Sequence, residues 1–173
     1  YVHGNYNSGP SDPMWGGGIN TTPHAAASII ADTVTVLSNN WSDANSMANP
    51  TNLAGRPAAT SYYRMAVAAG KNVPFPRPGW AGNDFGTDGG LHNFLRYLEN
   101  WGGQQLFYNG SLVSMYYSEY NTGTFKCCTV VYSPPTRNYS FDTLFLNPAN
   151  LPPGTPTFQD VVNLSYHQNF TPQ

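Results

Sequence analysis

The chain has 173 residues, a length typical of one domain with its own hydrophobic core. Only 9% of the residues are Asp, Glu, Lys or Arg and the formal net charge is -2, so the sequence offers no basic stripe for binding a nucleic acid. We expect a polar but largely uncharged surface, which is common among secreted and cell-surface proteins. Residues 1–173 are predicted to form a single β-rich domain.

The N-terminal residues alternate like a strand from the first position. The chain begins at Tyr1 without an initiator Met, and no apolar stretch is long enough to span a membrane. Because residues 1–7 look like the middle of a strand, we expect the chain to be the C-terminal part or a processed fragment of a longer protein. A Pro/Gly-rich loop follows over residues 8–18.

Two strands are predicted in the first half of the chain. Residues 27–37 are rich in β-branched side chains, which favours one strand over the whole segment. A loop over residues 38–57 follows, with Trp41 as its one large anchor. Residues 61–69 alternate aromatic or apolar residues with small ones and predict the next strand, and three prolines between residues 74 and 78 then favour an extended stretch.

One segment predicts an α-helix. Its apolar residues recur at i, i+3, i+4 and i+7, namely Leu91, Phe94, Leu95 and Leu98. Asp88 is suited to the N-cap, and Gly102 can take the left-handed conformation that ends a helix. We therefore predict a helix over residues 88–101 that packs its apolar face onto a β scaffold and leaves three polar residues outside: His92, Arg96 and Glu99.

The second half of the chain predicts further strands. Residues 104–118 form two strand-like runs that meet at Asn109-Gly110, a dipeptide typical of a hairpin turn and also compatible with a corner in a solenoid coil. Other strand or extended segments are predicted at residues 126–132, 138–146 and 158–170. Several strands pass through a small residue and continue, as successive coils of a β-solenoid do.

These patterns together predict a fold class. We expect a mainly β fold with one α-helix and long Pro/Gly-rich loops. The scaffold is either β-solenoid-like or a β-sandwich with the helix across one open end.

Carboxylates are few and scattered. Asp84 and Asp88 form the one close pair, and their spacing allows both to bind a calcium ion together with backbone carbonyls, although helix capping is the simpler explanation. No other cofactor is predicted. An enzyme acting on polysaccharides needs two carboxyl groups at a defined separation, and the sequence alone pairs none of the remaining candidates: Glu99, Glu119, Asp142 and Asp160.

Cysteines and tyrosines supply the other candidate sites. The adjacent Cys127 and Cys128 form either a strained vicinal disulfide, which implies an oxidising compartment, or two reduced thiols on opposite faces of a strand. Tyrosines on the open face of a strand can contact a sugar or a neighbouring subunit, and half-buried strand tyrosines are the alternative interpretation. The candidate interaction residues are Tyr62, Tyr63, Tyr116, Tyr117 and Tyr120.

Six ordered segments carry a family resemblance: residues 1–7, 31–43, 91–101, 108–114, 133–143 and 146–156. Together they resemble the C-terminal region of PilX-type pilus assembly proteins of bacteria. The resemblance implies a non-enzymatic structural or adhesive component of a type IV pilus-like filament, located outside the cell or on the bacterial surface. Full-length members carry an N-terminal hydrophobic pilin-like helix, which this sequence lacks.

The resemblance also implies partners, which are other copies of the chain or other filament subunits. It brings no catalytic residues. Two alternatives stay open at this point. The first is a carbohydrate-binding module that recognises a surface polysaccharide through coplanar aromatic rings. The second is a polysaccharide-active enzyme with two carboxylates in a groove.

Overall fold

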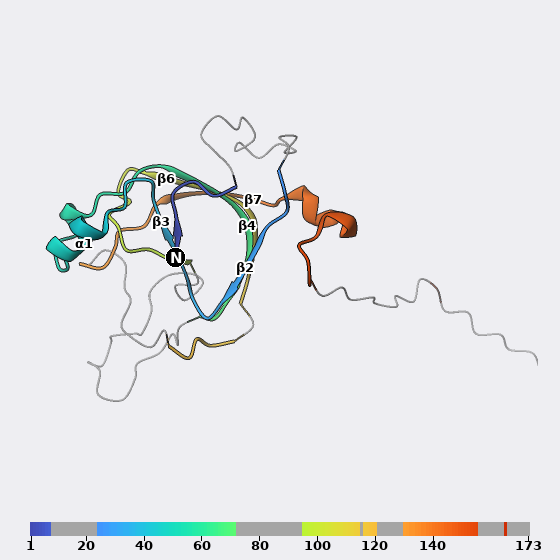
Figure 1. The fold of residues 1–173 in the computed structure, drawn as a ribbon. Helices are drawn as coiled ribbons and strands as arrows, with labels where there is room; N and C mark the ends of the chain where they lie inside the picture. Colours follow the sequence, from blue (N-terminus) through green and yellow to red (C-terminus); the bar gives the residue numbers. More distant parts are fainter. Residues whose placement is uncertain (8–23, 72–94, 115, 121–129, 156–164, 166–173) are drawn as a thin grey trace, which may run out of the picture.

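The computed structural model describes residues 1–7, 24–71, 95–114, 116–120, 130–155 and 165. Their regular structure is mostly β-strand, with one short helix, α1 (Asp43–Ala48) (Figure 1). The strands are β1 (Val2–His3), β2 (Ser28–Ala31), β3 (Val34–Leu37), β4 (Ser61–Ala69), β5 (Leu95–Arg96), β6 (Gln105–Val113) and β7 (Thr136–Ser140). Three short 3-10 turns are η1 (Leu53–Gly55), η2 (Thr143–Leu146) and η3 (Pro148–Asn150). Among the described helices, none is long and apolar enough to cross a membrane.

Every pairing between the described strands is parallel. One sheet has the order β1-β3-β5 and the other the order β2-β4-β6-β7, so each strand pairs with the corresponding strand of another pass of the chain. Figure 1 shows these passes following one another around a common interior. The mainly β prediction is confirmed. Parallel sheets of this kind do not clearly fit a β-sandwich, whose sheets are antiparallel.

A column of four tyrosines runs through the sheet of β4, β6 and β7. Tyr6 pairs in register with Tyr63, Tyr63 with Tyr108, and Tyr108 with Tyr139. We call these four residues the tyrosine column. The phenol of Tyr63 donates to the Leu37 carbonyl at 2.6 Å, so its polar end is satisfied inside the protein.

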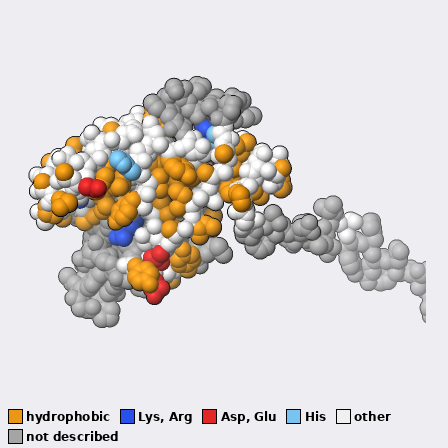
Figure 2. Space-filling model, viewed as in Figure 1, with side chains coloured by type: hydrophobic (Ala, Val, Ile, Leu, Met, Phe, Trp, Pro, Cys, Tyr) orange, Lys and Arg blue, Asp and Glu red, His pale blue; other side chains and the backbone are white. Residues whose placement is uncertain are grey.

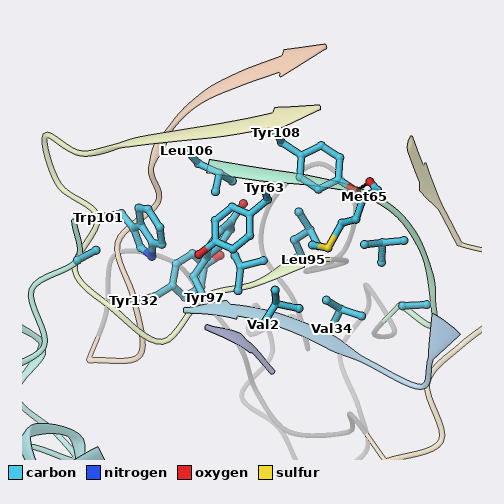
Figure 3. Packing of buried hydrophobic residues seen from close by; sticks show 14 residues of the cluster. Val2, Val34, Tyr63, Met65, Leu95, Tyr97, Trp101, Leu106, Tyr108 and Tyr132 are labelled. Atoms are coloured by element: carbon cyan, nitrogen blue, oxygen red, sulfur yellow. Dashed lines mark hydrogen bonds between the residues drawn. The ribbon is translucent and has the colours of Figure 1, made fainter. Parts of the chain in front are cut away.

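The core fills the interior that the sheets enclose. Side chains at alternate positions of β4 point inward, and the same alternation continues in β6. Figure 3 shows how aromatic rings from different passes meet there: Tyr63, Tyr97, Trp101, Tyr108 and Tyr132. Tyr97 contacts both Trp101 and Tyr132, with ring centroids 6.0 and 5.7 Å apart. Large rings thus occupy the space between the sheets.

The predicted helix over residues 88–101 is wrong in its described part. Leu95 and Arg96 form β5, which pairs in parallel with Val34 and Thr35 of β3. Leu95, Tyr97, Glu99 and Trp101 are all buried, a period of two that belongs to a strand rather than a helix. Leu95, Tyr97 and Trp101 share the period of two, whereas Leu98 fits only the helical spacing, and pairing with β3 decides for the strand. Residues 88–94 lie outside the described residues.

Two other element predictions need correction. Residues 27–37 form two strands, because the chain turns at Asp32 and Thr33 and passes from one sheet to the other. The hairpin at Asn109-Gly110 is wrong, since β6 runs through both residues as one strand in register with β4. The strand at residues 61–69 is confirmed with the predicted bounds.

The predicted C-terminal segments are described only in part. The extended segment over residues 138–146 is correct up to the end of β7 and then gives way to η2. Most of the strand predicted at residues 126–132, and nearly all of the one at residues 158–170, lies outside the described residues.

Candidate functional site

The sequence-predicted site residues divide into three groups. Asp84, Asp88, Cys127 and Cys128 lie outside the described residues. Tyr63 is completely buried in the tyrosine column, so its assignment to an interaction surface is wrong. Strand alternation explains this, because adjacent tyrosines of one strand point to opposite faces and Tyr62 alone takes the outer one. The remaining three tyrosines follow β6 in the chain.

Tyr62 stacks on the aromatic ring of the next pass. Its ring centroid lies 4.8 Å from that of Phe107, and the two stacked rings are nearly parallel, with an angle of 5° between their planes. The backbone N–H of Tyr62 donates to the Asn5 side chain at 3.1 Å, and Phe107 is in register with Asn138. Because the two rings cover each other's faces, this pair is poorly suited to be the flat platform expected of a carbohydrate-binding module.

Residues 116–120, which we call the tyrosine loop, expose three phenols. The exposed fractions of Tyr116, Tyr117 and Tyr120 are 43%, 52% and 80%. The Tyr116 hydroxyl donates to the Ala31 carbonyl at 2.8 Å, and the Lys71 ammonium lies 5.3 Å from the centre of the Tyr117 ring. The structure therefore brings three of the five predicted tyrosines together on one loop that is fixed to the sheet.

Asp32 holds the tyrosine loop in place. Its carboxylate accepts hydrogen bonds from the Ser118 hydroxyl and from the backbone N–H groups of Glu119 at 3.0 Å and Tyr120 at 3.4 Å. The Ser118 hydrogen bond is the main reason that the pKa of Asp32 lies below its ordinary value. This role of Asp32 is not evident from the sequence, because Ser118 lies 86 positions later in the chain.

Replacing Asp32 by Asn is expected to loosen the tyrosine loop. The lowered pKa means that the carboxylate stabilises the loop above its ordinary pKa of 3.8 and loses this effect as the pH falls through the lowered value. Amide hydrogen exchange at neutral pH should be faster for Glu119 and Tyr120 in Asp32→Asn. The control Asp43→Asn in α1 should leave these two amides unchanged, and equal effects of both variants would contradict the role of Asp32.

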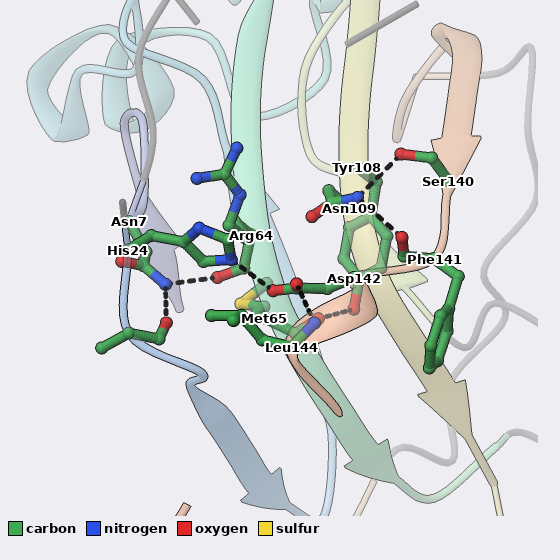
Figure 4. Close-up of polar contacts among 11 residues, drawn as sticks. Asn7, His24, Arg64, Met65, Tyr108, Asn109, Ser140, Phe141, Asp142 and Leu144 are labelled. Carbon is green, nitrogen blue, oxygen red and sulfur yellow. Dashed lines mark hydrogen bonds and ion pairs between the residues drawn. The ribbon is translucent and has the colours of Figure 1, made fainter. Parts of the chain in front are cut away.

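A second polar cluster lies on the outer face of β4 and β6 (Figure 4). His24 Nε2 lies 2.8 Å from Asp142 Oδ2, and the two side chains are only 4% and 1% exposed. Asp142 Oδ1 also accepts from the Leu144 N–H at 3.0 Å, which starts η2. The pair joins residues 118 positions apart, and its enclosure suits it to hold segments together rather than to meet a solute.

Neighbouring amides extend this cluster along the strands. Asn109 Nδ2 donates to the Ser140 hydroxyl at 2.9 Å and to the Phe141 carbonyl at 3.1 Å. Asn7 Nδ2 donates to the Ala25 carbonyl at 2.7 Å. The contacts of Asn109 with Ser140 and Phe141 fix the end of β7 against β6, and that of Asn7 links two segments near the N-terminus.

Glu99 forms a buried carboxylate site with Ser38. The Ser38 N–H donates to Glu99 Oε2 at 2.7 Å and the Ser38 hydroxyl donates to Oε1 at 2.6 Å. Both residues are fully buried. Burial raises the pKa of Glu99, and the hydrogen bonds from Ser38 oppose that shift. The helix prediction placed Glu99 outside, whereas the period of two over residues 95–101 would have indicated its burial.

An open pocket lies where β7 ends. β7 covers β6 only as far as Asn109, and among the described residues no strand pairs with residues 110–113 on that side. The pocket has a volume of 330 Å³ and is lined by Tyr108, Gly110, Leu112, Tyr139, Ser140 and Phe141. We call it the end pocket. Its walls are mainly apolar and aromatic side chains.

These features define a β-rich protein with parallel sheets, an aromatic interior and an exposed tyrosine loop. A comparison with known proteins finds no match to a family model, to a curated protein or to a solved structure. Among the described residues, no three or more His, Cys, Asp and Glu side chains gather as metal ligands would.

Proposed function

We propose that the chain is a β-solenoid that serves as a non-enzymatic structural or adhesive domain of an extracellular or cell-surface filament of the type IV pilus kind. The observation that carries the proposal is the in-register parallel stacking of successive passes, seen in the tyrosine column. Each pass buries its inner face on the next, as solenoid coils do. The resemblance to PilX-type proteins supports the same role.

Three of the described carboxylates each have a separate local partner, which supports a structural role over that of a polysaccharide-active enzyme. Glu99 is bound by Ser38 inside the protein, and Asp142 is paired with His24. Asp32 holds the tyrosine loop. A glycosidase requires two carboxyl groups that flank one bond of the substrate. Each of these three acids instead has its own local partner and a stabilising role.

The surface has few charged side chains, so it is suited to protein association that does not depend on electrostatic steering. Figure 2 shows a face on which Lys, Arg, Asp and Glu side chains are few and hydrophobic side chains lie among uncharged ones. Tyrosine is favoured at protein interfaces because its ring is large and apolar and its hydroxyl forms hydrogen bonds. We therefore assign the contact with filament subunits to the tyrosine loop, and we expect that contact to depend little on salt.

Co-sedimentation with sheared bacterial surface filaments tests this proposal. The wild-type chain should sediment with the filaments to a similar extent in low and high salt. The double variant Tyr117→Ala and Tyr120→Ala should bind at least about tenfold more weakly, as loss of two aromatic anchors predicts. Met47→Ala, a change at another exposed apolar residue, is the control. A chain that does not sediment with the filaments, or that cleaves a polysaccharide, would overturn the proposal.

A carbohydrate-binding module is the second candidate. The exposure of Tyr117 and Tyr120 on a fixed loop favours it, because exposed aromatic rings can pack on a sugar. Pull-down with insoluble cellulose, chitin and peptidoglycan distinguishes the two. Binding to a polysaccharide that the double tyrosine variant loses, without binding to filaments, would favour this second function.

A further inference from the structure

The first and last passes of the chain differ in charge. In the last pass, residues 130–140, Arg137 is in register with the fully buried Leu106 of β6. The Arg137 guanidinium donates a hydrogen bond to the hydroxyl of Tyr97, which is also buried, so the interior ends here at a charged side chain. The described part of the first pass, residues 1–7 and 24–31, contains no Asp, Glu, Lys or Arg. At that end the interior meets only uncharged or histidine side chains.

The first pass has apolar surface that its own chain covers only in part. Ala27, Ile29 and Ala31 pack against the core and are partly buried. Val67, the neighbour of Ile29 in β4, is only 1% exposed because it has a paired strand on both sides. Among the described residues β2 has a neighbour on one side alone, since it is the outermost strand of its sheet. The end of a stack of repeats needs either a polar cap or a further unit, and the first pass lacks charged residues for a cap.

The backbone of β2 has the groups that a further strand would need. The Ala66 N–H donates to the Ala27 carbonyl at 2.8 Å, so the backbone groups of Ala27 point toward β4. These groups alternate in direction along a strand, so those of Ile29 also point toward β4, whereas those of Ser28 and Ile30 point away. Outermost strands with such groups pair readily with another strand.

We infer that a second copy of the chain binds the first pass head to head, through antiparallel pairing of the two β2 strands. Ser28 of each copy lies opposite Ile30 of the other, so the outward backbone groups of both copies form hydrogen bonds. This register places Ile29 opposite Ile29 of the second copy, with both side chains directed into the joined interior. Apolar surface of both copies is thereby removed from water. Because the two contact surfaces are identical, the product is a closed two-fold dimer.

Charge and strand length favour this arrangement over head-to-tail stacking. In a head-to-tail stack the apolar first pass of one copy would cover Arg137 of the other, and the removal of that charge from water is strongly unfavourable. β7 also ends at Ser140, whereas β2 lies over the later columns of the sheet, so the last pass offers β2 no strand. The inference goes beyond the proposed function, because this self-association does not use the tyrosine loop.

Cysteine cross-linking tests the register directly. All variants carry Cys127→Ser and Cys128→Ser. In the dimer the Cα atoms of the two Ile29 residues lie about 4.5 Å apart, within the range of about 4.4 to 6.8 Å that a disulfide spans. Mild oxidation of Ile29→Cys should therefore give disulfide-linked homodimers.

Ile30→Cys is the matched control. Ile30 is 77% exposed and so more accessible than Ile29, which would raise its yield if cross-linking were due to random collision. In the dimer the two Ile30 residues are diagonal neighbours about 7 to 8 Å apart, so we expect roughly tenfold fewer homodimers than from Ile29→Cys.

A mixture of Ser28→Cys and Ile30→Cys chains with different tags provides a second test. Both positions are exposed, so these substitutions do not disturb the interior. Because Ser28 lies opposite Ile30 across the interface, mixed dimers should exceed the homodimers of either variant.

The possible outcomes separate the dimer from the proposed function. Equal yields of homodimers from Ile29→Cys and Ile30→Cys would overturn the dimer, and so would mixed dimers of Ile29→Cys with Tyr139→Cys in place of homodimers. A chain that forms no homodimers but still sediments with surface filaments would refute the head-to-head contact alone. A chain that forms them but does not sediment would refute the filament role alone.

Discussion

Replacing Gly110 by Ala is expected to destabilise the protein by about 3 kcal/mol or more, because the added methyl group has no room in the sheet. A Cβ atom at Gly110 would lie 1.9 Å from the Met65 carbonyl oxygen and 2.6 Å from the carbonyl carbon. These are backbone atoms of β4 in register with Gly110, so relief requires the two strands to separate. Urea denaturation should show a lower midpoint with an unchanged slope.

Gly103 provides the matched control. It has a φ of +77°, which favours glycine, but a Cβ atom there meets no other atom within 4 Å. Gly103→Ala should therefore cost only the penalty of a left-handed backbone, about 1 to 2 kcal/mol. Equal losses for the two variants would show that close approach to Met65 does not explain Gly110.

Gly110 also shows why the local sequence was misleading. Asn-Gly is the typical dipeptide of a tight hairpin, and nothing within the neighbouring residues distinguishes that use from a place where two strands approach closely. The distinguishing partner is Met65, which is 45 residues earlier in the chain. Parallel pairing always joins distant segments, so its register cannot be predicted from short patterns.

The other predictions also succeeded where the pattern is local and failed where the structure depends on pairing between distant segments. The strand at residues 61–69 was predicted with the correct bounds because its alternation is local. In its described part, the helix predicted over residues 88–101 was wrong because Leu91, Phe94, Leu95 and Leu98 match the helical spacing, whereas the buried face follows a period of two that includes the acidic Glu99. The burial of Tyr97 and Glu99 distinguishes the two, and it depends on distant residues, because Tyr97 packs against Tyr132 and Glu99 is bound by Ser38.

The candidate site was predictable only in its exposed aromatic part. Three of the five chosen tyrosines lie together on the tyrosine loop, since polar aromatic residues near a strand end commonly remain at the surface. The polar contacts that fix the loops could not be predicted. Ser38 and Glu99 are 61 residues apart, and His24 and Asp142 are 118 apart. Single acidic residues give no sign of such partners.

Replacing Glu99 by Ala is expected to cost about 3 kcal/mol, because it leaves two buried donors of Ser38 without their acceptor and opens a cavity. The loss should appear in the free energy of unfolding at neutral pH. In a double-mutant cycle, Ser38→Ala should cost much less in the Glu99→Ala background than in the wild type. Additive losses would show that the two side chains do not act as a unit.

The pH dependence gives Glu99 a second and independent signature. Because burial raises its pKa above the ordinary 4.5, the folded state holds the proton at pH values where the unfolded state has released it. Stability from this group is therefore greatest below pH 4.5 and decreases as the pH rises through the raised pKa.

Glu99→Gln cannot titrate, so the stability difference between wild type and Glu99→Gln should favour the wild type more at low pH than at neutral pH. Denaturation curves across this range measure the difference. A constant difference would mean that Glu99 has the same proton affinity folded and unfolded, whereas a reversed slope would assign it the behaviour of Asp32, whose pKa is lowered.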